Sequence, residues 1–263
     1  MDVVSLGFRT DLMVRRLSGS TVTDEGDHVV VRTPENPTFY WGNFLLLPEP
    51  PRDALAAARW LDVFAKTFPE AKHVAIGVDG TSGDAGDTAT FVAAGLDTEV
   101  NTVLTATELT EGQALDCRRI TTDDEWRQVG DVRVAAHSGD PQDPVEYETF
   151  VRRSVAQSRA TSEAGHAAWF GAVVDDEVRA SLGIVSDGSG LARYQMVETH
   201  PDFRRRGLAR SLVVEAARFA RTEMQAETLV IVADPDYVAI DLYRDLGFRD
   251  AERQVQLQRP SPD

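Results

Sequence analysis

The sequence has little cysteine, little basic charge and no long apolar run. Only one of its 263 residues is cysteine, so no disulfide can form within the chain, which fits a reducing compartment. Lys and Arg number 27 against 43 Asp and Glu, a formal charge of -16 that disfavours binding to nucleic acid. The longest apolar stretches, such as Phe44–Leu47 and Ala167–Val174, are far shorter than a membrane span, and no secretory signal is readable. We therefore expect a cytoplasmic protein without membrane or nucleic-acid partners.

The remaining composition is that of an ordinary globular protein. Hydrophobic residues make up 42% of the chain, and its length corresponds to one large or two small domains. The excess of acid suits a cationic ligand, although strong acidity more often serves solubility. The five histidines lack the spacing of metal ligands, so we predict no metal site. Cys117 has no activating neighbour and is expected to pack as a small apolar residue.

The second half of the chain predicts a layered α/β (α+β) sheet. Thr122 and Glu125 have capping-box spacing at the start of one helix, and a second helix covers Val145–Ala160. The full order is strand, two helices, three strands, helix, strand, helix, strand. The predicted strands are Asp116–Ile120, Ala167–Val174, Val178–Val185, Leu191–Thr199, Thr228–Ala233 and Phe248–Leu257, with a long helix over Arg205–Met224 and a short one that ends at Gly247.

The first half repeats this order as a degenerate copy. Phe91 corresponds to Tyr243, and Gly95 to Gly247, at an offset of 152 residues. A repeated order at a nearly constant offset indicates a duplicated domain, which we divide into residues 1–112 and 113–263. The matching elements are His28–Arg32, Phe39–Leu47, Arg52–Phe68, His73–Val78, Thr88–Ala94 and Val100–Thr107.

One segment of the second half, residues 200–209, carries a recognisable binding chemistry. It leads from a predicted strand into the long amphipathic helix, whose first turn exposes unpaired N–H groups and the positive end of the helix dipole. Gly207 would let a ligand approach that backbone. Positive charge comes from Arg204, Arg205, Arg206 and Arg210. The assembly suits a pyrophosphate but lacks the P-loop and dinucleotide fingerprints. The alternative is an exposed basic helix start that binds nothing.

Two motifs in this half resemble those of the GNAT superfamily of acyl-CoA-dependent N-acetyltransferases. Residues 204–209, Arg-Arg-Arg-Gly-Leu-Ala, match that family's phosphate loop, Arg/Gln-x-x-Gly-x-Gly/Ala. Residues 242–248, Leu-Tyr-Arg-Asp-Leu-Gly-Phe, match its Leu-Tyr-x-x-x-Gly-Phe segment. The resemblance covers about residues 115–258 and extends to the first half only as a degenerate copy. It implies tandem GNAT-like domains, each a mixed, mostly antiparallel sheet flanked by helices.

The resemblance also implies a reaction and a binding site. Acetyl-CoA would donate its acetyl group to a primary amine by direct attack in a ternary complex. Val197–Thr199 would pair with the pantetheine arm like an added strand, and Tyr243 would lie near the thioester sulfur. Asp236 stands where the family usually has Asn, which puts a side-chain contact to the cofactor in doubt. The residues implied for the pyrophosphate are Arg204, Arg205, Arg206, Gly207, Leu208, Ala209 and Arg210.

The chemistry of amide formation suggests an oxyanion donor, a general acid and a general base. A backbone N–H near Val197 or Glu198 would stabilise the oxyanion. The Tyr243 hydroxyl, whose pKa is ordinarily about 10, can donate a proton to the leaving thiolate. The alternative for Tyr243 is that it only packs in the apolar stripe of its helix, with Leu242 and Leu246. Glu198 is the candidate base that takes the amine proton, and its alternative is a strand carboxylate that faces water or forms an ion pair with an arginine. His200, before a proline, is more readily a turn residue.

The first half has lost the features of a cofactor site. Residues 51–56 stand opposite Arg204–Ala209, with Ala54 in place of the glycine and Asp53 where phosphate would bind, while Phe91 replaces Tyr243. We expect a structural half that helps to shape an acceptor cleft. The aromatic run Phe39–Trp41 either lines that cleft or fills a core or interface, the second being favoured.

The sequence does not identify the acceptor, which the resemblance implies to be an amine. The negative charge of the chain favours a cationic acceptor. Acidic residues Asp140, Asp143, Glu146 and Glu148 either attract it or form a solvated face. A non-catalytic acyl-CoA-binding or regulatory protein of the same fold is the alternative function. Binding of nucleic acid through the arginine cluster is a third, disfavoured by charge. Either a monomer or a homodimer is compatible with a fused pair of domains.

Overall fold

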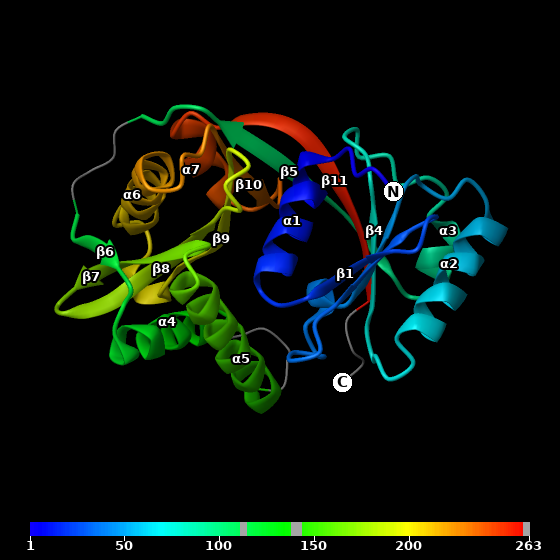
Figure 1. Cartoon of the computed structure of the whole chain (residues 1–263), viewed down its shortest axis with the longest axis horizontal. Helices are drawn as coiled ribbons and strands as arrows, with labels where there is room; N and C mark the ends of the chain where they lie inside the picture. The colour runs from blue at the N-terminus through cyan, green and yellow to red at the C-terminus, as the bar shows by residue number, and fades with distance from the viewer. Residues whose placement is uncertain (111–114, 138–143, 260–263) are drawn as a thin grey trace. The chain divides into compact units, whose positions relative to one another are not determined.

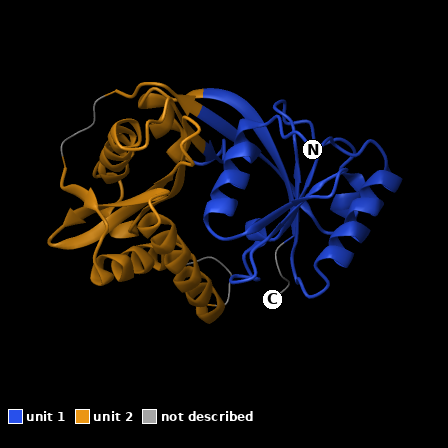
Figure 2. Cartoon of the chain, viewed as in Figure 1, with its two compact units in different colours: residues 1–104, 232–237, 250–263 blue, residues 105–231, 238–249 orange. Residues whose placement is uncertain are grey.

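The computed structural model describes residues 1–110, 115–137 and 144–259 as helices and strands that form two compact units (Figures 1 and 2). Unit 1 comprises residues 1–104, 232–237 and 250–263, and unit 2 comprises residues 105–231 and 238–249. The acidic loop residues Asp140 and Asp143 lie outside the described residues. Within the described part, no helix combines the length and hydropathy needed to cross a membrane.

Each unit is built from the predicted mixture of helices and strands. The helices are α1 (Leu6–Leu17), α2 (Ala54–Thr67), α3 (Ala89–Ala93), α4 (Asp123–Ala136), α5 (Pro144–Glu163), α6 (Leu208–Thr222) and α7 (Ala239–Asp245). The strands are β1 (Thr21–Asp24), β2 (Val29–Arg32), β3 (Phe44–Leu47), β4 (Val74–Val78), β5 (Asp97–Ala106), β6 (Cys117–Arg119), β7 (Ala167–Val174), β8 (Glu177–Val185), β9 (Leu191–Thr199), β10 (Thr228–Ala233) and β11 (Arg249–Arg259).

Unit 1 has a mostly antiparallel sheet in the order β1-β2-β3-β4-β11-β5. Strand β3 pairs in parallel with β4 across the connection through α2, while β1–β2, β2–β3 and β4–β11 are antiparallel. Alternation along the strands divides the core: Phe44 and Leu46 pack with α1, and Leu45 and Leu47 pack with α2 and α3. Both faces of this sheet are therefore covered.

Unit 2 repeats the same strand pattern. Its sheet runs β10-β9-β8-β7-β6, with β9 and β10 parallel and the other pairs antiparallel. Helices α4 and α5 cover one face, and α6 covers the other (Figure 1). The mixed, mostly antiparallel sheet predicted for each half is confirmed.

The two units also share the turn that ends their short helices. In unit 2, the Phe248 N–H donates to the Tyr243 carbonyl at 3.1 Å, and Gly247 has φ of 108°. In unit 1, the Leu96 N–H donates to the Phe91 carbonyl at 2.9 Å. Gly95, the counterpart of Gly247, also has positive φ, at 79°. A glycine with positive φ directly after a helix closes it in this way, so the same turn recurs at the predicted offset.

Several boundaries differ from the sequence-based prediction. The predicted strand Phe39–Leu47 begins only at Phe44, because Tyr40–Gly42 form a 3-10 turn whose Gly42 carbonyl accepts from the Thr33 hydroxyl at 2.7 Å. The long helix begins at Leu208 rather than Arg205, because Arg205 and Gly207 have positive φ. Helix α1 and strand β1 were not predicted, although Ser5 caps α1.

The units are discontinuous in sequence, whereas the sequence-based division is a single cut between residues 112 and 113. The C-terminal strand β11 pairs with β4 of unit 1 over Val74–Val78. Its Val255 and Leu257 are buried in the core formed with Leu45 and Ile76. A strand pairs with whichever edge completes its buried face, and alternation within the strand does not specify that neighbour. The roles assigned to the two halves stay predictions.

Candidate active site

Strand β9 carries an irregularity at the centre of the candidate site. Ser181 of β8 lies opposite Glu198, but Gly183 lies opposite Gln195, so β9 has one more residue than its partner between these pairs. Met196, within this extra stretch, has φ of 50°. A non-glycine residue in the left-handed region costs free energy, and β-bulges of this kind are frequent beside active sites. Val197 lies in the same stretch, and Glu198 directly follows it.

The parallel pairing of β9 also differs from that of its counterpart in unit 1. β9 pairs with β10 over Leu191–Arg193 and continues to Thr199. In unit 1, β3 pairs with β4 over Leu45–Leu47, up to the last residue of both strands. The bulged stretch of β9 therefore extends beyond its paired stretch with β10, and β3 has no such extension.

The N-terminus of α6 is shaped by Gly207. This residue is the N-cap, has φ of 81° and offers no side chain to the helix. The first turn contains no acidic residue, and the first intrahelical bond runs from the Ser211 N–H to the Gly207 carbonyl at 3.0 Å. The N–H groups of Leu208 and Ala209 precede this bond, so they and the helix dipole form an anion-binding arrangement.

The arginines of the loop have different positions. Arg204 donates to the carbonyls of Thr199 at 3.4 Å and Ala136 at 3.2 Å, which ties the loop to β9 and α4. Arg206 stacks on the Phe203 ring at 4.7 Å and donates to the Asp202 carbonyl at 3.0 Å. Arg205, with φ of 60°, is exposed. The positive charge therefore surrounds the helix start, although Arg204 and Arg206 also hold the loop itself.

His200 is a turn residue, as predicted. Its Nδ1 accepts a hydrogen bond from the Asp202 N–H at 3.3 Å, and its ring contacts Phe203 edge-on. The 3-10 turn Pro201–Phe203 thus connects β9 to the loop in a fixed conformation.

Glu198 forms the ion pair that was the alternative to its role as base. Its Oε2 accepts from Arg133 Nε at 3.0 Å, and the two side chains are 8% and 2% exposed. Arg133 also donates through Nη1 to the Ser154 hydroxyl at 2.8 Å. Sequence reasoning missed Arg133, although a cation among the apolar positions Trp126, Val129 and Val132 of α4 is a signal that could have identified it.

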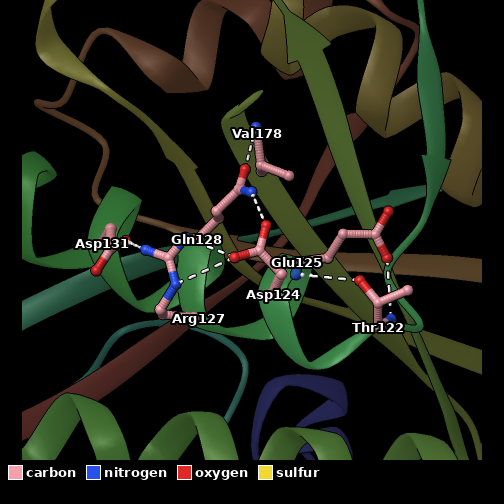
Figure 3. Close-up of polar contacts among 7 residues, drawn as sticks. All are labelled: Thr122, Asp124, Glu125, Arg127, Gln128, Asp131 and Val178. Carbon is pink, nitrogen blue, oxygen red and sulfur yellow. Dashed lines mark hydrogen bonds and ion pairs between the residues drawn. The ribbon is translucent and has the colours of Figure 1, made fainter. Parts of the chain in front are cut away.

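The helix that carries Arg133 is fixed by polar contacts at its start (Figure 3). Thr122 and Glu125 form the predicted capping box: the Glu125 N–H donates to the Thr122 hydroxyl at 3.2 Å, and the Glu125 carboxylate accepts from the Thr122 N–H at 3.0 Å. Gln128 accepts from the Val178 N–H of β8 at 2.7 Å. These contacts set the position of α4 against the sheet.

Tyr243 lies in α7 and is 5% exposed, with its ring 6.2 Å from that of Phe248. Phe248 also contacts Tyr194, whose hydroxyl donates to the Val213 carbonyl at 2.8 Å. Burial raises the pKa of Tyr194. Tyr243 therefore packs in an aromatic cluster with Phe248, and its acid role stays a prediction.

Asp236 follows β10 and belongs to unit 1, where its N–H donates to the Asp234 carboxylate at 2.8 Å. Its side chain is exposed. The contact to a cofactor predicted for it stays a prediction.

In unit 1 the corresponding helix start is occupied by its own side chain. Asp53 is the N-cap of α2, and its carboxylate accepts from the Ala56 N–H at 2.8 Å. Asp53, rather than the predicted Ala54, therefore takes the place of Gly207. Among the aromatic residues of this unit, Tyr40 stacks on His73 at 4.8 Å, and Trp41 donates to Gln258 at 2.8 Å.

Part of the sequence matches the model of a known family. Residues 131–248 match the model of the Acetyltransferase (GNAT) family. The matched segment contains the β9 bulge, the loop before α6 and Tyr243. The resemblance seen in the two sequence motifs is confirmed.

Solved structures extend the likeness to both units. A functionally unknown conserved protein from Staphylococcus epidermidis ATCC 12228 has a TM-score of 0.76 at 12% identity, covering 93% of this chain and 95% of its own. A GCN5-related N-acetyltransferase from Kribbella flavida gives 0.66 at 14% identity, covering 98% and 97%. A tandem GNAT protein from the clavulanic acid biosynthesis pathway gives 0.55 at 15% identity, covering 95% and 88%. No curated protein matches the sequence. These identities establish the fold alone, and the predicted tandem GNAT fold is confirmed.

Proposed function

We propose that the protein is an N-acetyltransferase that moves an acetyl group from acetyl-CoA to a primary amine in unit 2. The observation that carries this proposal is the N-terminus of α6, where Gly207 caps the helix without a side chain and the first turn contains no acid. Exposed arginines surround it, against a net charge of -16 for the chain. This donor set suits a pyrophosphate.

The residues that would hold acetyl-CoA fit the group. The N–H groups of Leu208, Ala209 and Arg210 would bind the pyrophosphate, with Arg204, Arg205 and Arg206 adding charge around it. Val197 and Thr199, on the stretch of β9 beyond its pairing with β10, would pair with the pantetheine arm through their backbone groups.

The reaction forms one C–N bond and breaks one C–S bond. Acetyl-CoA supplies a thioester carbonyl, which the neutral amine attacks directly in a ternary complex. The backbone N–H of Val197 or Glu198, beside the bulge, would donate to the developing oxyanion. Tyr243 would give its hydroxyl proton to the departing thiolate. The amine loses a proton to Glu198 or to water in contact with it.

Calorimetric titration with acetyl-CoA tests the cofactor assignment. We expect one site per chain, lost in Gly207→Glu because a carboxylate would then stand at the helix start. Two sites would contradict the structural role of unit 1, and no binding would contradict the proposed function. Asp53→Ala is the matched control, because it changes the equivalent position of unit 1.

Release of free thiol in the presence of a panel of primary amines tests catalysis. Sustained turnover with any of them supports the enzyme. Binding of acetyl-CoA without turnover across mono-, di- and polyamines and amino sugars would favour the alternative, a non-catalytic acyl-CoA-binding protein of the same fold. Turnover also assigns the coarse acceptor class, for which the acidic chain favours cations.

A further inference from the structure

The buried pair of Arg133 and Glu198 joins three elements of unit 2. Arg133 comes from α4, Glu198 from β9 and Ser154 from α5, and the guanidinium contacts both partners at 3.0 and 2.8 Å. Glu198 comes two residues after Met196, whose positive φ marks the bulge. The pair therefore connects α4 and α5, on one face of the sheet, to β9, the strand beside which the acetyl group of acetyl-CoA would lie.

The buried pair of Arg133 and Glu198 adds little to the stability of the folded protein. Arg133 Nη2 is fully buried and has no hydrogen-bond partner in the part of the chain that the structure describes. A buried donor without a partner loses its hydration, and a buried ion pair is often no better for stability than apolar residues of the same volume. The incomplete pairing of Arg133 therefore indicates that its role is to hold Glu198 in place and not to stabilise the fold.

The two oxygens of Glu198 differ. Oε2 is held by Arg133, whereas Oε1 has no hydrogen bond within the described residues and is not among their fully buried unpaired atoms. One oxygen is thus fixed and the other is left for a further donor, beside the bulge. Because the pair has no net charge, a contact to Oε1 would supply direction more than electrostatic attraction.

We propose that Arg133 is a positioning residue for the amine acceptor, which fixes Glu198 through Oε2 so that Oε1 accepts a hydrogen bond from the acceptor nitrogen. This inference rests on the proposed function and deepens it, because it assigns the residue that orients the amine. Arg133 itself does not touch the acceptor. Its effect on amine binding must therefore disappear when Glu198 can no longer accept a hydrogen bond.

The test is a double-mutant cycle on amine binding, with CoA already bound. n-Butylamine and spermidine are titrated into the CoA complexes of the wild type, Arg133→Met, Glu198→Leu and the double variant. We expect each single variant to raise the dissociation constant of the amine about tenfold or more, as for loss of a hydrogen bond to a charged group. The double variant should be no weaker than Glu198→Leu, because Arg133 acts through Glu198.

Three further comparisons distinguish a specific loss of amine binding from misfolding of a variant. The double variant replaces the whole pair by apolar side chains, so it should fold even where a single variant leaves an unpaired buried charge. Ser154→Ala loosens the guanidinium without removing its charge and should weaken amine binding less than Arg133→Met. Arg127→Met removes an exposed arginine of the same helix, paired with Asp124 and Asp131, and should change nothing (Figure 3).

Three results would overturn the inference: unchanged amine binding in Arg133→Met, a double variant whose loss is the product of the single losses, or a wild-type CoA complex that binds neither amine. Failure of the wild type to bind CoA would instead contradict the proposed function. CoA affinity should stay within about twofold across the variants, because the substitutions change only side chains, whereas the contacts proposed between β9 and the pantetheine arm use backbone groups.

Discussion

Asp53 and Gly207 are the N-cap residues of equivalent helices, and only one of them supplies an acceptor to its helix. The Asp53 carboxylate accepts from the Ala56 N–H at 2.8 Å, whereas Gly207, with φ of 81°, has no side chain to offer. The helix start of unit 1 is therefore satisfied from within, and that of unit 2 suits an external anion. This difference supports the proposed cofactor site in unit 2 and the absence of one in unit 1.

Gly207→Ala should weaken the binding of acetyl-CoA by about tenfold. An alanine with positive φ costs about 1–2 kcal/mol, so the loop would relax and move its N–H groups. Gly165→Ala is the matched control in unit 2, because Gly165 has φ of 83° and a Cβ added to it would meet no atom within 4 Å. Calorimetry should show weaker binding only for Gly207→Ala. Equal losses of affinity in both variants would mean that general backbone strain, and not a change in the loop before α6, weakens the binding of acetyl-CoA.

Asp53→Ala should destabilise the protein without creating a second cofactor site. Loss of an N-cap costs about 1 kcal/mol, seen as a lower midpoint in urea unfolding. The stoichiometry for acetyl-CoA should remain one per chain, because unit 1 lacks both the bulge and the extension of β9. A second site in this variant would show that Asp53 alone had blocked binding there.

Tyr243→Phe should lower kcat by about a hundredfold with little change in KM, if the hydroxyl protonates the leaving thiolate. Tyr194→Phe is the control within the same aromatic cluster. It loses a buried hydrogen bond to the Val213 carbonyl and about 1 kcal/mol of stability, but it should keep its turnover. Thiol release is measured under conditions in which chemistry limits the rate. Full turnover by Tyr243→Phe would leave the residue only its packing role.

Local signals in the sequence predicted much of unit 2. The capping box of Thr122 and Glu125, the glycine before α6 and the turn at Gly247 each depend on a few neighbouring residues, and each is present. Local propensities and caps act over one or two turns, so they can be recognised without knowing the tertiary structure.

The parts that escaped prediction depend on distant residues. Arg133 and Glu198 are 65 positions apart, and no periodicity connects them. The Met196 bulge comes from a residue type that gives no sign of positive φ. Strand β11 alternates as a strand should, but its pairing with β4 is decided by which core its apolar face completes. Tertiary packing, which the local pattern does not encode, determines all three.

Cys117 should react slowly with alkylating reagents at neutral pH. Burial raises the pKa of its thiol to about 11, and the charges of Glu215 and Asp116 act in the same direction. The thiolate is the reactive form, so the rate should increase with pH up to about 11. Mass spectrometry after treatment with iodoacetamide between pH 7 and 10 gives the rate, with a cysteine peptide as reference. A rate equal to that of the peptide at pH 7.5 would contradict the effect of burial.

Leu257→Ala should destabilise unit 1, although residue 257 is close to the end of the chain. Leu257 is fully buried in the core that contains Leu45 and Ile76, so truncation should cost about 2–5 kcal/mol. Amide hydrogen exchange should accelerate in β4 and α2 more than in β8 and α6, because the lost contacts belong to unit 1. Gln256→Ala, on the same strand with a partly exposed side chain, is the control and should change both sets little. Faster exchange confined to β8 and α6 would contradict the assignment of β11 to the core of unit 1.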